Sequence, residues 1–202
     1  MTSTERQGVA RVATVADTDA IVSALATAFF HDPIWGPVFP DEQQRAAQEA
    51  ALWRIYVTSA LRYHWTLVTP NVEAAAVWIP PGGIELTREE EEGRENLLTQ
   101  IGGVESAASI LALYHQLEEA VPAEPCFYLT LLGVHDDHRG HGWGMCLLAE
   151  SLARIDALGA PAYLESSNPA NNPRYHSAGF VSRDQITTAT GHIFTTMWRP
   201  AR

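Results

Sequence analysis

The stretch FYLTLLGVHDDHRGHGWG, residues 127–144, joins a nonpolar segment directly to a glycine-rich loop. Its first part, 127–134, lacks strict alternation of polar and nonpolar residues, which is typical of a strand covered on both faces. The loop then has a glycine at every second position and leads into an amphipathic helix predicted over 142–158. Glycines let the main chain curl around one anion, and the free amides at a helix start favour negative charge. This strand–loop–helix unit therefore predicts a site for a phosphate or pyrophosphate.

Arg139, which stands three residues before Gly142, would add a side-chain cation to such a site. Two common phosphate-binding motifs do not fit the loop. The P-loop requires GxxxxGK[ST], and the dinucleotide motif requires GxGxxG in an early strand–helix–strand unit, whereas this loop has GxGxG far along the chain. By themselves, alternating glycines are equally compatible with a turn that only caps a helix.

The rest of the chain alternates predicted strands and helices. Helices are expected from Asp17 to His31 and after Asp41, and residues 84–121 are interpreted as a helical insertion between strands. Strands are expected at the start of the chain, in the hairpin 66–81, at 161–167 and, as two β segments, within 186–199; a turn and short helix fall in 168–180. With no internal repeat and no linker, this pattern predicts one domain spanning residues 1–202, of the α/β class with a mixed sheet.

Composition excludes several classes of function. The net charge of -11 on 202 residues repels phosphate backbones, so we expect no nucleic-acid partner. Cys126 and Cys146 are the only cysteines, which gives no disulfide framework and no zinc cluster. The first residues lack the nonpolar core of a secretory signal, and no stretch approaches the ~18 nonpolar residues of a membrane span. We therefore expect a reduced, cytoplasmic, soluble protein with no membrane association.

Two motifs in a defined order carry a resemblance. Arg-x-x-Gly-x-Gly follows the strand ending in Leu-x-Val, and an asparagine is followed seven residues later by a tyrosine and then by Gly-Phe. These residues are Arg139, Gly142 and Gly144, then Asn168, Tyr175, Gly179 and Phe180. This pattern resembles the GNAT superfamily of N-acetyltransferases. Within it, the chain is similar to the puromycin N-acetyltransferases over nearly its whole length, closely in the carboxyl half and only in outline in the amino half.

The resemblance implies a fold and a cosubstrate. In this superfamily two neighbouring parallel strands, here ending at Val134 and near Ser166, splay apart and hold the pantetheine arm of acetyl-CoA. The amide of Val134 would then polarise the thioester carbonyl. The residues that the resemblance assigns to the cosubstrate are Leu132, Val134, Arg139, Gly140, His141, Gly142, Trp143, Gly144, Asn168 and Asn171. Asn168 is equally well interpreted as a helix cap.

The resemblance also implies direct transfer of the acetyl group to an amine, with Tyr175 as the general acid for the departing thiolate. A buried tyrosine with a satisfied hydroxyl is the alternative. The strand glutamate that serves many members as the base is replaced here by Val77, Trp78 or Ile79. Glu165 is the first substitute, although a structural carboxylate is as good an interpretation. His31 and Asp32 are expected in the acceptor pocket, with turn chemistry as the alternative for Asp32.

Three further groups of residues have plainer interpretations. His135, Asp136, His138 and His141 resemble metal ligands in composition, but they lie in the phosphate loop, so no metal is expected. The acidic run Glu89–Glu92 with Glu95 fits a solvated helix face better than a site for cations. Trp35, Trp53, Trp65 and Trp78 fit core packing as well as an aromatic acceptor pocket.

These observations predict an acetyl-CoA-dependent N-acetyltransferase acting on the primary amine of a small molecule, for which an antibiotic such as an aminonucleoside is a plausible acceptor. The alternatives are a catalytically silent acetyl-CoA-binding module and a peptide N-terminal acetyltransferase. A homodimer is one possible assembly.

Overall fold

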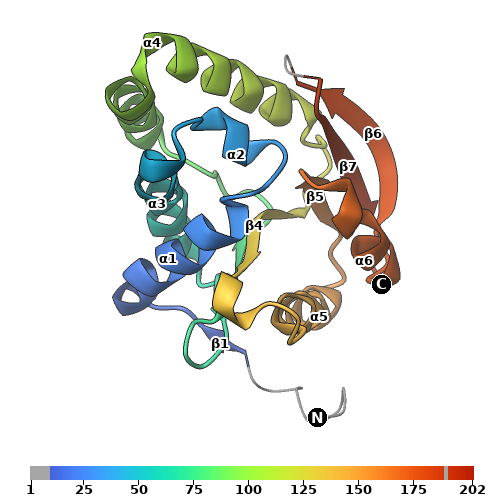
Figure 1. The fold of residues 1–202 in the computed structure, drawn as a ribbon. Helices are drawn as coiled ribbons and strands as arrows, with labels where there is room; N and C mark the ends of the chain where they lie inside the picture. The colour runs from blue at the N-terminus through green and yellow to red at the C-terminus, as the bar shows by residue number, and fades with distance from the viewer. Residues whose placement is uncertain (1–9, 189–190) are drawn as a thin grey trace.

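The computed structural model describes residues 10–188 and 191–202, in which seven strands form one mixed sheet of order β1-β2-β3-β4-β5-β7-β6 (Figure 1). The strands are β1 (Arg11–Val12), β2 (Leu67–Val68), β3 (Ala74–Ile79), β4 (Phe127–Val134), β5 (Ala162–Ser166), β6 (Val181–Thr187) and β7 (Ile193–Arg199). The helices are α1 (Thr18–Phe29), α2 (Trp35–Val38), α3 (Glu42–Ala60), α4 (Arg88–Ala120), α5 (Trp143–Asp156) and α6 (Asn172–Ser177). This is the mixed α/β fold expected from the sequence.

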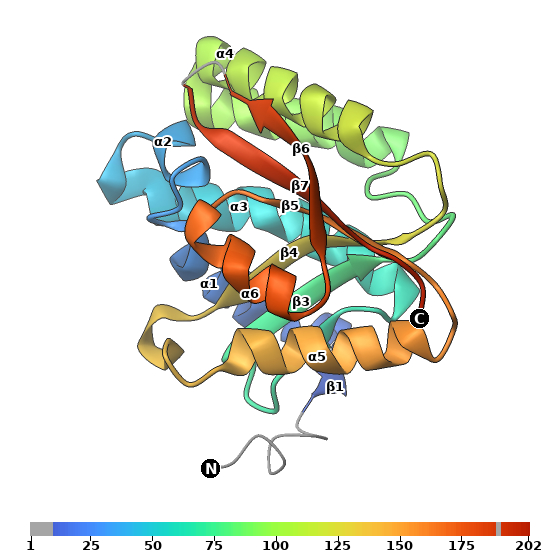
Figure 2. The same cartoon turned by 90° about the vertical axis from the view of Figure 1, so that its right-hand side faces the viewer.

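The sheet separates two nonpolar cores. Along β3, alternate side chains point to opposite faces, so Ala75 and Val77 join the core beneath α1, α3 and α4. Ala76 and Trp78 join the core beneath α5. Figure 2 shows α5 and α6 on the near side of the sheet, with α1 and α3 beyond it. Both faces of the central strands are therefore covered, as their composition predicts.

The helices begin and end where the sequence provides caps. The Asp41 side chain accepts a hydrogen bond from the Gln43 amide at the start of α3, and Thr87 and Glu90 form a reciprocal capping box at the start of α4. Helix α1 ends at Phe29, and the turn His31-Asp32-Pro33 follows after one residue, Phe30. Gly159, with a φ of 62°, follows the last turn of α5.

Helix α4 fills most of segment 84–121 and breaks at Gly103, whose φ is 78°. Within the described residues, α4 is the one helix long and nonpolar enough to cross a membrane, with a window of mean hydropathy 1.2 that is 22% buried. No such stretch was expected from the sequence. The break at Gly103 and the packing of Leu98 and Ile110 on the core still favour a helix that lies on the protein.

Strands β4 and β5 are parallel neighbours that part along their length. Their pairing runs from Phe127 with Ala162 to Leu129 with Leu164 and stops there. Beyond that point β4 pairs with β3, and β5 pairs with β7. The register between β3 and β4 also shifts between Val77 and Trp78, which leaves Thr130 as an extra residue on β4. The expected splay of the two strands is confirmed.

Two elements differ from the sequence-based expectation. Residues 35–38, interpreted as part of a turn, form the short helix α2. Strand β6 begins at Val181 instead of near Ile186, and nearly all of its residues are exposed. An edge strand exposed on both faces needs no nonpolar alternation, so its polar sequence gave no strand signal. Residues 189 and 190, which were expected within this last β region, lie outside the described residues.

Candidate active site

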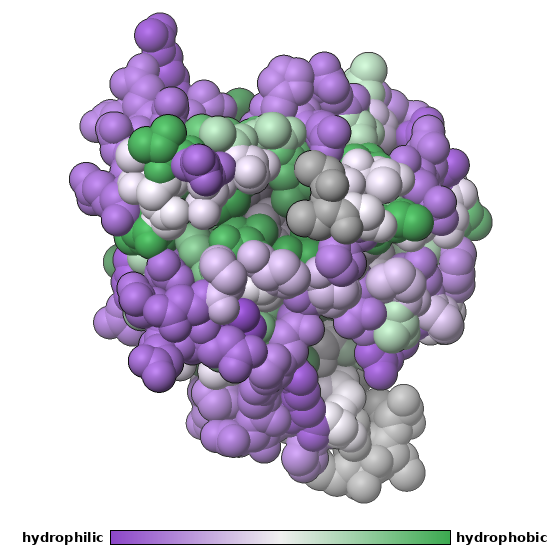
Figure 3. Space-filling view, turned by 45° about the horizontal axis from the view of Figure 1, so that its top comes forward, coloured by the Kyte–Doolittle hydropathy of each residue, from purple (hydrophilic) through white to green (hydrophobic). Residues whose placement is uncertain are grey.

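A cavity of about 640 Å³ lies where β4 and β5 part. Residues 129–134 of β4, residues 164–166 of β5, the loop before α5, the end of α1 and the last turns of α4 all line it. Figure 3 shows nonpolar residues gathered in a hollowed band on the face of the molecule that carries α4, with polar residues around it. The volume suits a small molecule or the end of a long one.

The glycine-rich loop leaves the start of α5 open. Gly140 and Gly142 have φ values of 80° and 76°, a backbone region that residues with a side chain rarely adopt. Gly142 is the residue before α5, and within the described chain no side chain caps the helix there. A Cβ added to Gly144 would lie 3.2 Å from a methyl group of Val134. The loop therefore keeps free amides at the positive end of the helix dipole, at the edge of the cavity.

Arg139 fastens this loop to α1. Its guanidinium donates hydrogen bonds to the carbonyl oxygens of Thr27, at 3.3 Å, and Ala28, at 3.0 Å. It also forms an ion pair of 2.6 Å with Asp136. The guanidinium is half-exposed and lies on the cavity wall. Its contact with an anion stays a prediction, and in this structure the side chain positions the loop.

The other predicted cosubstrate residues lie around the same cavity. Leu132 and Val134 stand on the part of β4 that has left β5, so β5 supplies no pairing there. Asn168 accepts a hydrogen bond of 3.0 Å from the Ala170 amide, which is the cap interpretation. Asn171 accepts one of 2.5 Å from Arg174. Gly140, Gly142, Trp143 and Gly144 line the cavity, whereas His141 is exposed beside it, its ring 3.1 Å from the His138 carbonyl oxygen.

Tyr175 reaches the cavity from α6 and packs edge-on against Phe180. Burial, with a further contribution from the charge of Asp32, raises the pKa of its phenol to about 12. Among the described residues its hydroxyl has no hydrogen-bond partner. The hydroxyl is therefore protonated at neutral pH and is available to a ligand.

Glu165 lies on β5 where the two strands part. Burial raises the pKa of its carboxyl to about 8, although the hydroxyls of Tyr128 and Tyr163 favour the charged form. Its Oε1 is buried and has no hydrogen-bond partner among the described residues. A carboxyl group that lines a cavity and has one buried oxygen without a partner is a candidate for contact with a bound ligand.

Glu85 is a cavity residue that sequence reasoning missed. It stands in the loop between β3 and α4, and its carboxylate accepts a hydrogen bond of 2.8 Å from the hydroxyl of Thr130. Burial raises the pKa of this carboxyl to about 7. A single glutamate in a turn after Pro-Pro-Gly-Gly belongs to no motif, so only the fold brings it to β4.

His31 and Asp32 both line the cavity. Asp32 Oδ1 accepts hydrogen bonds from the amides of Ile34 and Trp35, at 2.9 and 3.1 Å. This is the turn chemistry expected as the alternative from the sequence, and a role for Asp32 in acceptor binding stays a prediction. The His31 side chain is exposed and contacts the ring of Phe30 edge-on.

One end of the cavity has an aromatic wall. Trp35 contacts Trp53 edge-on, with ring centroids 5.1 Å apart, and lies 5.6 Å from Tyr114. Tyr114 stacks on Tyr56 at 5.5 Å. Because these four rings come from α2, α3 and α4, the inserted helix helps to build this wall. Of the other tryptophans considered, Trp78 is fully buried in the second core.

The residues described by the structure contain no group of three or more His, Cys, Asp and Glu side chains placed to hold a metal ion. Two histidine rings of the loop contact backbone groups of the loop itself. His135 accepts a hydrogen bond of 3.3 Å from the Asp137 amide, and His141 lies against the His138 carbonyl.

The chain is similar to several solved structures, and no protein-family model matches it. A Corynebacterium glutamicum protein named histone acetyltransferase HPA2 and related acetyltransferase has a TM-score of 0.70 at 23% identity, over 96% of each chain. Arylalkylamine N-acetyltransferase 2 from Aedes aegypti has a TM-score of 0.68 at 17% identity, over 96% of this chain and 98% of its own. A Drosophila melanogaster polyamine N-acetyltransferase has a TM-score of 0.65 at 19% identity, over 94% of this chain and 97% of its own. Together with the splayed strands and the glycine-rich loop, these likenesses show that the chain has the GNAT acetyltransferase fold.

Proposed function

We propose that the chain is an acetyl-CoA-dependent N-acetyltransferase that moves an acetyl group onto the primary amine of a small molecule. One observation carries the proposal: the uncapped start of α5 opens beside the gap between β4 and β5. A pyrophosphate fits the free amides of residues 142–144, and an extended chain fits the unpaired edge of β4 beyond Leu129. The acyl donor supplies the acetyl group as a thioester.

The residues around the gap divide the remaining roles. Leu132 and Val134 offer main-chain groups to the pantetheine arm, and the Val134 amide polarises the acetyl carbonyl. Tyr175 faces the leaving sulfur. Because the pKa of Tyr175 is about 12, above that of a thiol, its hydroxyl stabilises the thiolate as a hydrogen-bond donor more readily than it gives up its proton. Glu165 is the base expected from the sequence, and its raised pKa suits proton transfer near neutral pH.

The aromatic wall supports a finer proposal about the acceptor. The rings of Trp35, Trp53 and Tyr114 favour an amine joined to a flat, nonpolar body, such as an aminonucleoside antibiotic. The Aedes neighbour is named for arylalkylamines and the Drosophila neighbour for polyamines, so small amines are common to both. The carboxyl groups of Glu85 and Glu165 line the same cavity, and a bound ammonium group would favour their charged forms.

The proposal is tested by measuring thiol release from acetyl-CoA with a panel of amines. The panel contains an aminonucleoside, an arylalkylamine, a polyamine, an aminoglycoside and a dipeptide with a free amino terminus. We expect release with the small amines, fastest with those that carry an aromatic ring. Coenzyme A binding without release for any amine would favour a silent binding module, and selective release with the dipeptide would favour peptide N-terminal acetylation.

A further inference from the structure

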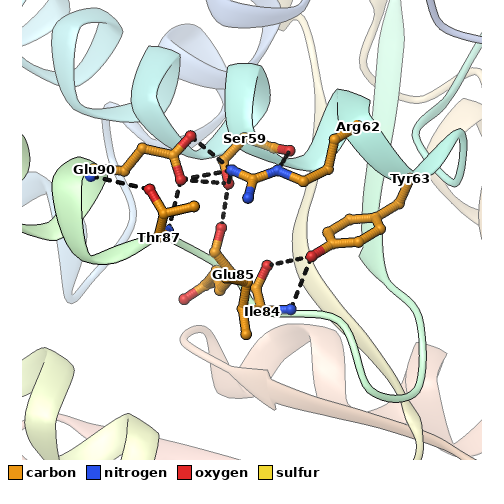
Figure 4. A network of polar contacts seen from close by, with 7 residues as sticks. All are labelled: Ser59, Arg62, Tyr63, Ile84, Glu85, Thr87 and Glu90. Atoms are coloured by element: carbon orange, nitrogen blue, oxygen red, sulfur yellow. Dashed lines mark hydrogen bonds and ion pairs between the residues drawn. The ribbon is translucent and has the colours of Figure 1, made fainter.

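The backbone around Glu85 is held by side chains from the end of α3 and from the 3₁₀ helix Leu61–Tyr63 that follows it (Figure 4). Ser59 Oγ donates a hydrogen bond of 2.5 Å to the Glu85 carbonyl oxygen. The Tyr63 hydroxyl donates to the Ile84 carbonyl at 3.1 Å and accepts from the Ile84 amide at 2.9 Å. Two successive residues of this loop are therefore fixed, one to α3 and one to the 3₁₀ helix after it, which restricts where the Glu85 side chain can reach.

A charged group stabilises the same corner. Arg62 contacts both carboxylate oxygens of Glu90, at 2.6 and 2.5 Å, and donates to the Ser59 carbonyl at 2.7 Å. Glu90 also closes the capping box with Thr87 at the start of α4. One residue of the acidic run thus has a structural role, because it joins the first turn of α4 to the end of α3 beside Glu85.

The Glu85 side chain points from this corner to the point where β4 and β5 part. Its Oε1 lies 2.8 Å from the hydroxyl of Thr130, the extra residue of β4 next to the last paired residue, Leu129. Glu165 stands on β5 directly after its last paired residue, Leu164. The two glutamates therefore reach the cavity from either side of the opening between the strands.

The groups that face Glu85 come from four elements. The charge of Glu85 contributes to the raised pKa of Tyr56 of α3, of Tyr114 of α4 and of Tyr128 of β4. From α4, Arg94 lowers the pKa of Glu85 and Glu118 raises it. From β5, Glu165 has its own pKa raised by the charge of Glu85. Three carboxyl groups, Glu85, Glu118 and Glu165, thus share the site with the single guanidinium of Arg94, and a cationic guest would relieve the repulsion between the carboxylates.

We propose that Glu85 is a second carboxylate of the acceptor site, which binds the ammonium group of the acceptor amine beside Glu165 and takes a proton from it. This inference rests on the proposed acetyl transfer and adds a residue to it. Coupled carboxyl groups in one cavity share protons as a pair. The pKa of Glu85 is about 7 and that of Glu165 about 8, because Arg94 and the Thr130 hydroxyl favour the charged form of Glu85, and that charge in turn raises the pKa of Glu165; Glu85 is therefore ionised first as the pH rises.

Protons and bonds balance in this transfer. An ammonium nitrogen loses two protons when it becomes an amide. The Glu85–Glu165 pair takes the first, through Glu85, which frees the nitrogen lone pair to form the N–C bond to the acetyl carbon as the C–S bond breaks. The sulfur leaves as a thiolate and ends as a thiol. The second proton from the nitrogen supplies that thiol, and the proton on Glu85 returns to solvent.

Two substitutions test the proposal by moving the pH profile in opposite directions. In the wild-type protein, kcat/KM should rise with pH through a limb between about 7 and 8, where the pair ionises. Thr130→Val keeps both carboxylates but removes a hydrogen bond that lowers the pKa of Glu85, so the limb should move to higher pH. Glu85→Gln should lower kcat by about 100-fold. Its remaining limb should lie at lower pH, because the charge that raises the pKa of Glu165 is gone.

Glu119→Gln is the matched control, because this glutamate is exposed on α4 outside the cavity and should leave the profile unchanged. Coenzyme A binding by each variant shows that it is folded, and Thr130→Val covers the case in which Glu85→Gln fails to fold. Unchanged profiles in both variants, with acetyl transfer intact, would overturn the role of Glu85 alone. If the wild-type protein transferred no acetyl group to any amine, the proposed function itself would be wrong and this role would fall with it.

Discussion

The hydroxyl of Ser167 donates a hydrogen bond of 2.7 Å to Oδ2 of Asp32, which joins the end of β5 to the turn after α1. Asp32 Oδ1 holds the amides of Ile34 and Trp35 at the same time. One buried carboxylate thus fixes Trp35 in the aromatic wall and ties that wall to the strand that carries Glu165. The two sides of the cavity are connected through Asp32.

Asp32→Ala should therefore destabilise the protein by about 2–3 kcal/mol, because three hydrogen bonds to a buried carboxylate are lost. Urea unfolding measures the effect. Ser167→Ala, which removes one of these bonds, should cost less. His31→Ala is the matched control, since an exposed side chain should change the stability by less than ~0.5 kcal/mol. Equal stabilities for Asp32→Ala and His31→Ala would refute the structural role of Asp32.

Gly142→Ala should weaken binding of coenzyme A, because the new side chain enters a strained backbone region at the start of α5. Gly159→Ala is a control matched in strain: its φ is 62°, and it lies at the far end of the same helix. Each substitution should cost about 1 kcal/mol of stability. Calorimetry should show weakened binding for Gly142→Ala only. Equal affinities for the two variants would argue against the loop as the phosphate site.

Tyr175→Phe should lower kcat by about 100-fold and leave the affinity for coenzyme A unchanged. The melting temperature should also stay the same, because no described residue forms a hydrogen bond with the Tyr175 hydroxyl. With a pKa of about 12, Tyr175 should produce no falling limb in the pH profile below about pH 10. Wild-type turnover in the variant would show that the Tyr175 hydroxyl does not stabilise the leaving thiolate.

Glu49 should make the protein less stable as the pH rises. Its side chain is fully buried, and neither carboxyl oxygen has a hydrogen-bond partner among the described residues. Burial raises the pKa of this carboxyl to about 8, whereas an unfolded glutamate ionises near ~4.3. The unfolded chain thus loses this proton first, and the free energy of unfolding should fall by about 2 kcal/mol between pH 6 and pH 8.

Glu49→Gln removes the titrating group, so the slope of stability against pH should be clearly shallower than in the wild-type protein over this range. Denaturant unfolding at several pH values gives both slopes. Glu85 and Glu165 contribute in the same direction to both proteins and cancel in the comparison. Parallel slopes would show that Glu49 does not carry this dependence.

Much of the carboxyl half could be predicted from the sequence, because its signals are local. The strand ending at Val134, the glycine-rich loop and the helix ended by Gly159 each depend on neighbouring residues, and the structure places them where they were expected. The edge strand β6 was predicted to start too late, since exposure on both faces leaves no periodic pattern.

The acceptor side could be predicted less well, because long-range contacts build it. Glu85 contacts Thr130 across forty-five positions, and Ser167 contacts Asp32 across one hundred and thirty-five. Neither pair has a sequence motif. The aromatic wall likewise depends on how α4 packs over α3, so core packing and an acceptor pocket could not be told apart from the tryptophans alone.

Titration calorimetry of the purified wild-type protein with coenzyme A tests most directly the claim that the amides at the start of α5 hold a pyrophosphate. We predict saturable heat with one site per chain, and weaker binding of pantetheine, which lacks the pyrophosphate together with the adenine nucleotide. Absence of heat, or equal affinity for the two compounds, would contradict the claim.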